Sequence, residues 1–296
     1  MFSRTDLALE TKGSMEGEIE GVEFEEKKLK KLTITKINIK TPQAAKSIGK
    51  PMGKYVTVEV PILSDNSEDF EINVKVISDQ MKKLIPSTGL VLVIGLGNSS
   101  ITPDSLGPKT IKTVIATRHI EKEISKFFSS NLRSVAALAP GVLGQTGIEI
   151  VEILKSLARK IGPKCVIVVD ALASEQAKRL GRAIQISDTG ISPGSGVGNS
   201  RPLIDEKTIG VPIISVGIPM VVDAQSLAVD LMDLSSQEEI EQIQEKINPQ
   251  GACMMVTPRD IDVLIERASN LLSSSINLAL HPNFDFKDLK LLSEQI

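Results

Sequence analysis

Two aspartates follow apolar runs of the chain, at positions where a carboxylate is expected to be partly buried. Asp170 ends the run CVIVVD, and Asp104 lies in the loop TPDSLGP, a few residues after the apolar run 91–95. A carboxylate at the end of a fully apolar strand is partly desolvated, which costs free energy unless it has a partner or a function. Asp104 has an alternative role as a helix N-cap, because Pro108 is expected to begin a helix soon afterwards.

The two carboxylates can do chemistry together if their strands are neighbours in a sheet. They would then face one crevice and share one proton, because two close carboxylates do not easily ionise together. One member of such a pair can activate a water as a base while the other gives a proton to a carbonyl oxygen. Alternatively, the pair can hold a divalent cation through its oxygen atoms.

Alternating strands and helices are expected to position these aspartates. Apolar runs rich in β-branched residues occur at 91–95, 134–138, 165–169 and 213–217, as is typical of strands buried on both faces of a parallel sheet. Helical segments separate them, which predicts an α/β fold with a three-layer, doubly wound, mostly parallel sheet. Ligands bind beyond the carboxyl ends of such strands, and here the following loops carry glycines or carboxylates.

The segments outside this core have weaker patterns. The first 20 residues are polar and without periodicity, so we expect a flexible arm, and residues 22–63 predict a small β-rich element. Thr146 and Glu149 have the spacing of a capping box at the start of a helix. Residues 235–247 predict a charged amphipathic helix with a solvated face.

Composition excludes several functional classes. The net charge is 34 − 37 = −3 and aromatic residues make up 3% of the chain, so no direct nucleic-acid binding is expected. His119 and His281 are the only histidines; both are expected at the surface or at a cap, and they leave almost no material for a histidine-based zinc site. Cys165 is expected to be a buried thiol. No apolar stretch approaches the ~20 residues of a membrane span, and the N-terminus has no hydrophobic signal core, so we expect no membrane association and a cytoplasmic location.

Three glycine-containing loops have other interpretations. Gly95-Leu96-Gly97 follows a strand as a dinucleotide-binding loop does, but the third glycine is absent and Pro103-Asp104 interrupts the expected helix. Asp188-Thr189-Gly190 matches the tripeptide of pepsin-like enzymes, which are all-β and need two such loops. The loop 194–198 could cradle an anion with backbone N–H groups, although it lacks the lysine and spacing of a P-loop. A nucleotide- or anion-binding α/β module that uses the loops 95–98 and 194–198 therefore stays open.

Five segments together resemble the germination protease family of spore-forming bacteria. In order they are GLGNSSITPDSLGPK, APGVLGQTGIE, VVDALAS, QISDTGISPGSGVGN and GIPMVVDA, and the resemblance extends from RTDLALE to MMVTPRDID. It implies an atypical aspartic endopeptidase whose two aspartates match Asp104 and Asp170. It also implies a fold similar to that of hydrogenase maturation endopeptidases, in which acidic residues hold a metal. Because Pro103 replaces the first acid of that motif and no matching histidine is evident, a dyad without metal or cofactor is favoured, with a metal-dependent endopeptidase as the alternative.

The resemblance further implies a zymogen that removes a short N-terminal segment by self-cleavage. Processing sites in the family have an acidic residue before an apolar one, which predicts cleavage between Asp6 and Leu7. The expected organisation is a propeptide at 1–6 and a single α/β peptidase domain at 7–296, with a β-rich part at 7–85 and an α/β core at 86–296. The implied substrates are small acid-soluble DNA-binding spore proteins, degraded during germination in the spore core. The implied assembly is a homotetramer.

Other polar and glycine residues in these loops are candidates for supporting the dyad. Some are expected to stabilise an oxyanion and others to lie behind the aspartates. The candidates are Asn98, Glu149, Asp188, Gly194, Ser195 and Gly196.

Overall fold

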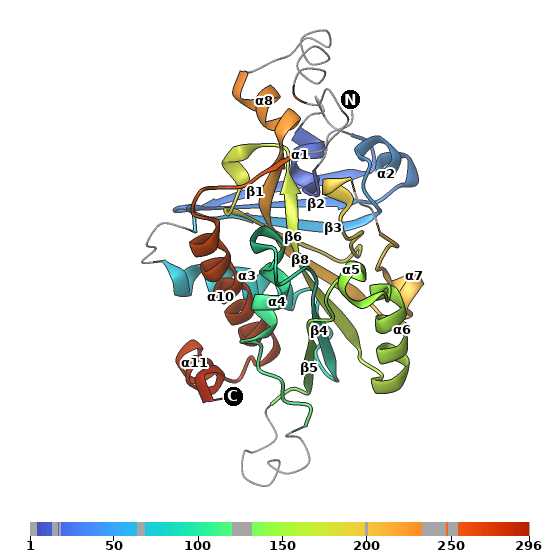
Figure 1. Ribbon diagram of the computed structural model, residues 1–296, viewed down its shortest axis with the longest axis vertical. Helices are drawn as coiled ribbons and strands as arrows, with labels where there is room; N and C mark the ends of the chain where they lie inside the picture. The colour runs from blue at the N-terminus through green and yellow to red at the C-terminus, as the bar shows by residue number, and fades with distance from the viewer. Residues whose placement is uncertain are drawn as a thin grey trace.

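One mixed sheet runs through the whole molecule (Figure 1). The computed structural model describes residues 5–13, 17, 19–63, 69–119, 132–198, 201–232, 247 and 254–295. Within these ranges the strand order is β1-β2-β3-β7-β8-β6-β4-β5, and β9 pairs with β8. The strands are β1 (Val22–Leu29), β2 (Leu32–Ile39), β3 (Gly53–Glu59), β4 (Val91–Gly95), β5 (Val135–Leu138), β6 (Cys165–Ser174), β7 (Ala183–Ser187), β8 (Ile213–Asp223) and β9 (Met255–Val256).

The centre of the sheet is parallel. β5 lies beside β4, β4 beside β6 and β6 beside β8, all in parallel register. The strands β7, β3, β2 and β1 then extend the sheet from β8 in antiparallel pairs. The β-rich N-terminal residues therefore continue the same sheet that carries the two aspartates.

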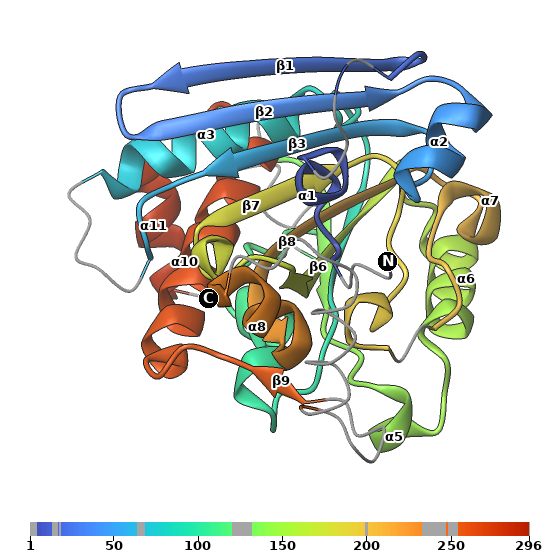
Figure 2. The ribbon, with the colours of Figure 1, turned by 90° about the horizontal axis from the view of Figure 1, so that it is seen from above.

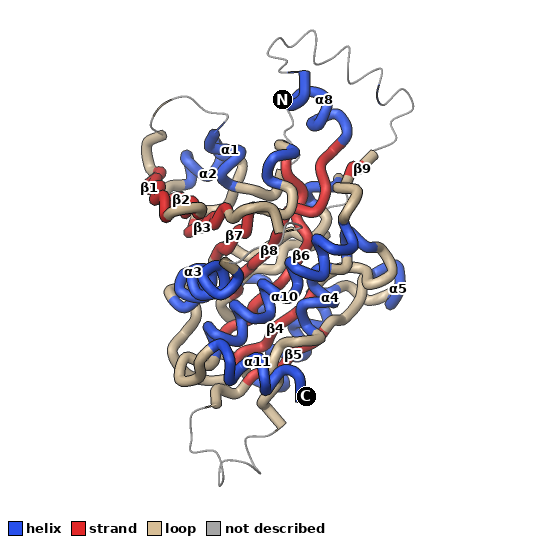
Figure 3. The backbone as a smooth tube through the Cα atoms, turned by 90° about the vertical axis from the view of Figure 1, so that its left-hand side faces the viewer, coloured by secondary structure: helices blue, strands red, loops and turns tan. Residues whose placement is uncertain are grey.

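Helices cover both faces of the parallel strands (Figure 1), and Figure 3 looks onto one of these two faces. On one face lie α3 (Phe70–Lys82), α4 (Leu106–Ile111) and α10 (Ile261–Leu280); on the other lie α6 (Ile150–Ile161) and α7 (Glu206–Ile209). Alternate side chains of a strand point to opposite faces: on β4, Val91 and Val93 join the core under α3 and α10, whereas Leu92 and Ile94 join the core under α6. This double burial explains the continuous apolar runs, and the predicted doubly wound α/β fold is confirmed.

The remaining helices lie around the edges and ends of the sheet. They are α1 (Ala8–Gly13), α2 (Pro42–Ile48), α5 (Leu143–Thr146), α8 (Ala224–Met232) and α11 (Phe286–Gln295). Figure 2 shows α1 and α2 beside β2 and β3, where Ala8 and Ile48 pack with Ile37 and Tyr55. Among the described residues, no helix combines the length and apolar character needed to cross a membrane.

Residues 5–10, near the N-terminus, pack against the rest of the protein. Leu7 and Ala8 are fully buried, and Glu10 is 4% exposed. The expectation of a flexible segment is therefore wrong for residues 5–10. Their polar groups find partners far away in the chain, which a search for local periodicity cannot detect.

Two local expectations also fail. The capping box does not form, because Gly147 adopts a left-handed conformation that ends α5, and Thr146 Oγ1 instead accepts a hydrogen bond from the Ile148 N–H. Glu149 occupies the N-cap position of α6 without a side-chain cap. His281 is fully buried at the C-terminal end of α10, so it is a capping-position residue but not a surface one.

Other expectations have different outcomes. Cys165 is buried, as predicted. The helix expected at 235–247 lies outside the described residues except for its last position.

Candidate active site

Asp104 and Asp170 lie on adjacent elements at the carboxyl end of the parallel strands. Asp170 is part of β6, and Asp104 ends a 3-10 turn, Thr102–Asp104, in the loop after the neighbouring strand β4. The Asn98 N–H donates to Asp104 Oδ2 at 2.7 Å. Helix α4 has no side-chain N-cap bond, so the interpretation of Asp104 as its cap is wrong. Both carboxylates instead line one cavity of about 550 Å³.

Burial raises the pKa of both carboxyl groups. Asp170 is 7% exposed, and burial, followed by the charges of Asp104 and Asp6, raises the pKa of its carboxyl well above the usual value. Burial also raises the pKa of Asp104, but the hydrogen bond from the Asn98 N–H opposes that shift. The Ala171 N–H likewise donates to Asp170 Oδ1 at 2.9 Å, which opposes the rise of the pKa there. Both carboxyl groups therefore bind a proton more readily than a free aspartate, as a pair that shares a proton requires.

A glycine allows the turn that carries Asp104. Gly97 has φ +115°, and a Cβ there would lie 1.9 Å from the Asp104 carbonyl oxygen and 3.1 Å from its Oδ1. Only glycine fits both the backbone conformation and this close approach. The sequence Gly95-Leu96-Gly97 thus has a structural reason that does not involve a dinucleotide.

The N-terminal segment enters the same cavity through Asp6. The Asp6 N–H donates to the Ala173 carbonyl at 3.0 Å, and the Ala173 N–H donates to Asp6 Oδ2 at 2.8 Å. Ser195 Oγ donates to Asp6 Oδ1 at 2.8 Å. A Cβ at Gly196 would lie 2.4 Å from Asp6 Oδ2, so the absence of a side chain there makes room for the carboxylate. β6 and the glycine-rich loop therefore form a fitted pocket for the Asp6 side chain.

One side chain holds the peptide bond that follows Asp6. Gln185 Nε2 donates to the Asp6 carbonyl oxygen at 2.9 Å, and Gln185 Oε1 accepts from the Ala8 N–H at 2.7 Å. Leu7, between them, packs into a small apolar cluster with Leu172. The Asp6–Leu7 peptide is thus fixed from both sides at the edge of the cavity.

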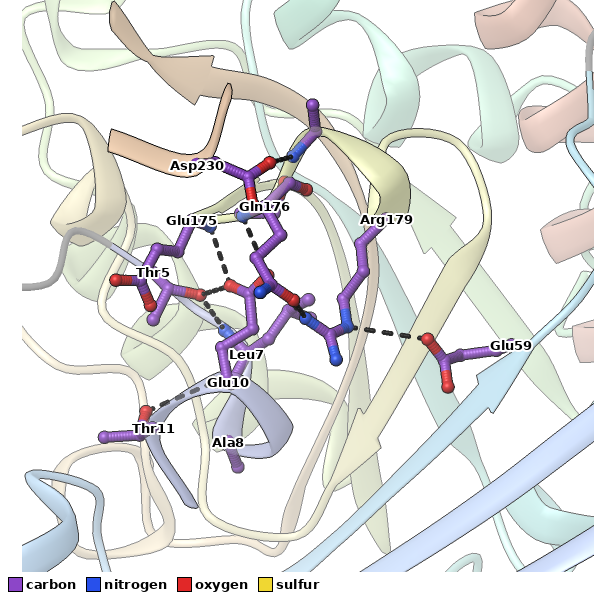
Figure 4. A network of polar contacts seen from close by, with 12 residues as sticks. Thr5, Leu7, Ala8, Glu10, Thr11, Glu59, Glu175, Gln176, Arg179 and Asp230 are labelled. Atoms are coloured by element: carbon purple, nitrogen blue, oxygen red, sulfur yellow. Dashed lines mark hydrogen bonds and ion pairs between the residues drawn. The ribbon is translucent and has the colours of Figure 1, made fainter. Parts of the chain in front are cut away.

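Glu10 anchors the segment further along (Figure 4). Its carboxylate accepts the backbone N–H of Glu175 at 2.7 Å and of Gln176 at 3.0 Å. Arg179 Nη1 donates to the same carboxylate at 3.1 Å, and the Thr5 hydroxyl donates to it as well. A buried carboxylate with this many donors is stably held, since each donor offsets part of its desolvation.

Lys50 adds a positive charge beside the segment. Its Nζ donates to the Thr5 carbonyl at 2.8 Å. Burial lowers the pKa of Lys50, while the charges of Asp6 and Glu10 raise it. The segment is therefore held by backbone pairing, by an apolar contact and by complementary charge.

The supporting candidates divide by position. Asn98, Glu149, Gly194 and Gly196 line the cavity. Ser195 contacts the side chain of Asp6, whereas the Asp6 carbonyl oxygen accepts from Gln185. In this state the glycine-rich loop therefore binds an acidic side chain and not a carbonyl oxygen.

Two acidic candidates have partners of their own. Glu149 forms an ion pair with Arg201 at 3.9 Å. Asp188 lies apart from the cavity, and its Oδ1 accepts the Lys54 N–H at 2.7 Å.

Sequence reasoning missed Gln185, Glu10 and Arg179. Gln185 interrupts the apolar strand AIQIS, and this single polar residue in a buried strand was the available signal. Glu10 and Arg179 are 169 residues apart, so no local pattern connects them.

Two other features bear on ligand binding. Within the described residues, no three His, Cys, Asp or Glu side chains gather as a metal site would require. A larger hollow of about 1030 Å³ lies at the opposite, amino ends of β4 and β5, where its described lining includes Lys82, Arg118 and Arg133 but no carboxylate. The paired carboxyl groups therefore lie in the smaller cavity.

Known proteins match this chain over nearly its full length. The family model described as germination protease matches residues 4–236 and 231–292. The germination protease of Clostridium perfringens is 41% identical over 97% of both chains, and that of Clostridium tetani is 39% identical over 98% of both. The germination protease of Priestia megaterium is 34% identical over 95% of this chain and 94% of its own. Among solved structures, a [NiFe] hydrogenase maturation protease, HycI from Thermococcus kodakarensis, aligns with a TM-score of 0.34 and 13% identity, covering 67% of this chain and 98% of that one.

Proposed function

Since the chain belongs to the germination protease family and is therefore a hydrolase of peptide bonds, we propose that it is a self-processing spore endopeptidase with an aspartate dyad. Asp104 and Asp170 are the acid–base pair. The intact chain is the zymogen, and its first cleavage is at the Asp6–Leu7 bond.

One observation carries this proposal. Asp6 lines the same cavity as both aspartates, so the Asp6–Leu7 peptide lies at its edge, and the charge of Asp6 contributes to the raised pKa of Asp170. An acidic side chain fills one fitted pocket and the following leucine fills an apolar one. This is the arrangement expected of a substrate, and while it persists it keeps other peptides out of the cavity.

The proposed chemistry gives Asp104 the role of base and Asp170, whose pKa is raised well above its usual value, the role of acid. Asp104, as the carboxylate, takes a proton from a water whose oxygen attacks the Asp6 carbonyl carbon. Asp170 gives its proton to the carbonyl oxygen, so a neutral gem-diol forms. The diol then collapses: the C–N bond breaks, Asp104 passes its proton to the Leu7 nitrogen, and Asp170 recovers a proton from a hydroxyl. The products are a carboxyl group on Asp6 and an amino group on Leu7, with the dyad restored.

Intact-mass measurement after incubation of the purified chain at mildly acidic pH tests this function. The wild type should lose residues 1–6, whereas Asp104→Asn and Asp170→Asn should stay intact and folded. Asp188→Asn is the matched control, because Asp188 lies outside the cavity and the substitution keeps its Oδ1 acceptor. Processing of either dyad variant at the wild-type rate would refute the dyad.

The proposed substrates in trans are small acid-soluble spore proteins, within the spore core. The pockets for Asp6 and Leu7 support a preference for an acidic residue followed by an apolar one. The processed chain should cleave such a protein at acidic–apolar steps, as mass spectrometry of the fragments would reveal. A homotetramer is proposed as the assembly, and sedimentation equilibrium of the intact chain would give its mass.

A further inference from the structure

We propose that Gln185 is the residue that grips the scissile peptide and stabilises its carbonyl oxygen during cleavage, an inference that rests on the proposed function. It applies to the chain's own segment and to any peptide that replaces it.

Gln185 and Asp170 belong to one row across three strands. On β8, Gly217 lies directly opposite Asp170 of β6 on one side and opposite Gln185 of β7 on the other. Directly paired residues point to the same face of a sheet, so both side chains leave the sheet in the same direction. Neighbouring strands are about 4.8 Å apart, which separates the two backbones by about 9.6 Å. The Leu172 side chain occupies the space beside Gly217, where a Cβ would lie 2.7 Å from Leu172 Cγ. Leu172 also packs with Leu7, so the segment lies over this row.

The hydrogen-bond partners of Gln185 indicate its role. Its side chain is buried, at 8% exposure for the residue. Within the described chain, its Nε2 and Oε1 bond only to the backbone of Asp6 and Ala8. If that segment left without a replacement, the buried amide would lose both of its hydrogen-bond partners, which is unfavourable for a polar group away from water. Both polar atoms of this buried amide are therefore bonded to the backbone on the two sides of the Asp6–Leu7 bond, as expected of a residue that binds a peptide chain.

The amide also suits the reaction. A carbonyl oxygen has two lone pairs, so Nε2 can donate to one while Asp170 delivers its proton to the other. Charge that develops on this oxygen during attack strengthens the bond from Nε2, which lowers the barrier and not only the binding energy. The second contact, from the Ala8 N–H to Oε1, fixes the orientation of the amide. The glycine-rich loop was expected to stabilise the oxyanion, whereas in the structure Gln185 contacts the carbonyl oxygen.

Self-cleavage of the full-length chain provides the test. Gln185→Met removes both polar contacts, and Gln185→Glu keeps the acceptor but donates only when its carboxyl is protonated. Ser215→Ala is the control, because it removes a buried hydroxyl of β8 that bonds to Ser187 and does not contact the segment. First-order processing rates come from intact mass, and hydrogen exchange at residues 7–10 reports whether the segment stays docked.

We expect Gln185→Met to slow processing by about 100-fold or more, the usual effect of losing one oxyanion donor. The glutamate variant should recover relative to the wild type as the pH falls, since a protonated carboxyl donates again, whereas the ratio for Gln185→Met should not depend on pH. If Gln185 only docks the segment, processing should slow in proportion to the protection from hydrogen exchange that residues 7–10 lose.

Processing of Gln185→Met at the wild-type rate would overturn this inference and leave the dyad standing. Slower processing that is fully explained by the loss of docking would also overturn this inference. Processing of Asp104→Asn, or a wild type that never cleaves, would overturn the proposed function and this inference together.

Discussion

The carboxylate of Glu10 lies 3.1 Å from Nη1 of Arg179, and only 1% of the Glu10 side chain is exposed. This buried ion pair joins the N-terminal segment to the loop that follows β6. Because it lies beyond the Asp6–Leu7 bond, it holds the segment in register with the cavity. Glu10 therefore positions the segment and remains part of the chain after the proposed cleavage.

Loss of Arg179 should release the segment. Arg179→Met leaves the Glu10 carboxylate buried with fewer donors, and breaking a buried pair typically costs about 3–5 kcal/mol. Hydrogen exchange at residues 7–10 should accelerate and processing should slow, while the core strands keep their protection. Glu25→Gln, which removes an exposed pair with Lys36, should change neither. Unchanged exchange in Arg179→Met would mean that the pair does not anchor the segment.

A methyl group at position 196 should expel Asp6. The new Cβ would lie 2.4 Å from Asp6 Oδ2 and 2.6 Å from Ala173 Cβ, and overpacking of this kind costs about 1–3 kcal/mol. Gly196→Ala should therefore slow self-processing, as followed by intact mass. Gly13→Ala is the control, because no atom lies within 4 Å of a Cβ there. Processing of both variants at one rate would refute the fitted pocket.

Stability should depend on pH through Asp170. Its carboxyl has a raised pKa in the folded chain, so the folded state binds a proton that the unfolded state releases. The stabilisation from this proton is complete below the ordinary value of 3.8 and is lost as pH rises through the folded pKa. The substitution Asp170→Asn removes the titrating group and therefore this dependence.

Urea unfolding of non-processing chains measures this effect. Asp104→Asn should lose stability relative to the Asp104→Asn/Asp170→Asn double variant as the pH rises above about 4. His281 acts in the opposite sense, because burial lowers its pKa to about 4 and its contribution is lost as pH falls, but it is common to both chains and cancels. A constant difference between the two chains would show that Asp170 titrates normally.

Chelation should leave self-processing unchanged. The proposed mechanism moves protons between two carboxyl groups and needs no cation, so the mass change should proceed equally with and without a chelator. Loss of processing in the chelator, restored by one added divalent metal, would instead make Asp104 and Asp170 ligands of that metal.

The sequence predicted the parts of this site that depend on local pattern. Asp170 was identified because it ends a fully apolar run, and Asp104 because a loop with glycine and proline follows the neighbouring strand. Gln185 and Glu10 were not, because their roles depend on partners 165 to 179 residues away. The capping box at Thr146 failed for the reverse reason: the spacing was present, but Gly147 ended a separate short helix first.

Anchoring through Glu10 has a kinetic consequence. The proposed cleavage after Asp6 would free the first six residues, whereas Leu7 would stay joined to α1 and, through Glu10, to the loop after β6. The new amino terminus is therefore a tethered product, and short tethers give effective concentrations on the order of millimolar. A substrate in trans must displace this terminus. The apparent affinity for the substrate is therefore the intrinsic affinity multiplied by the fraction of enzyme whose cavity is vacant. Weakening the anchor at Arg179 should thus have opposite effects on the two reactions, slowing self-processing while lowering the KM of the processed enzyme for other peptides.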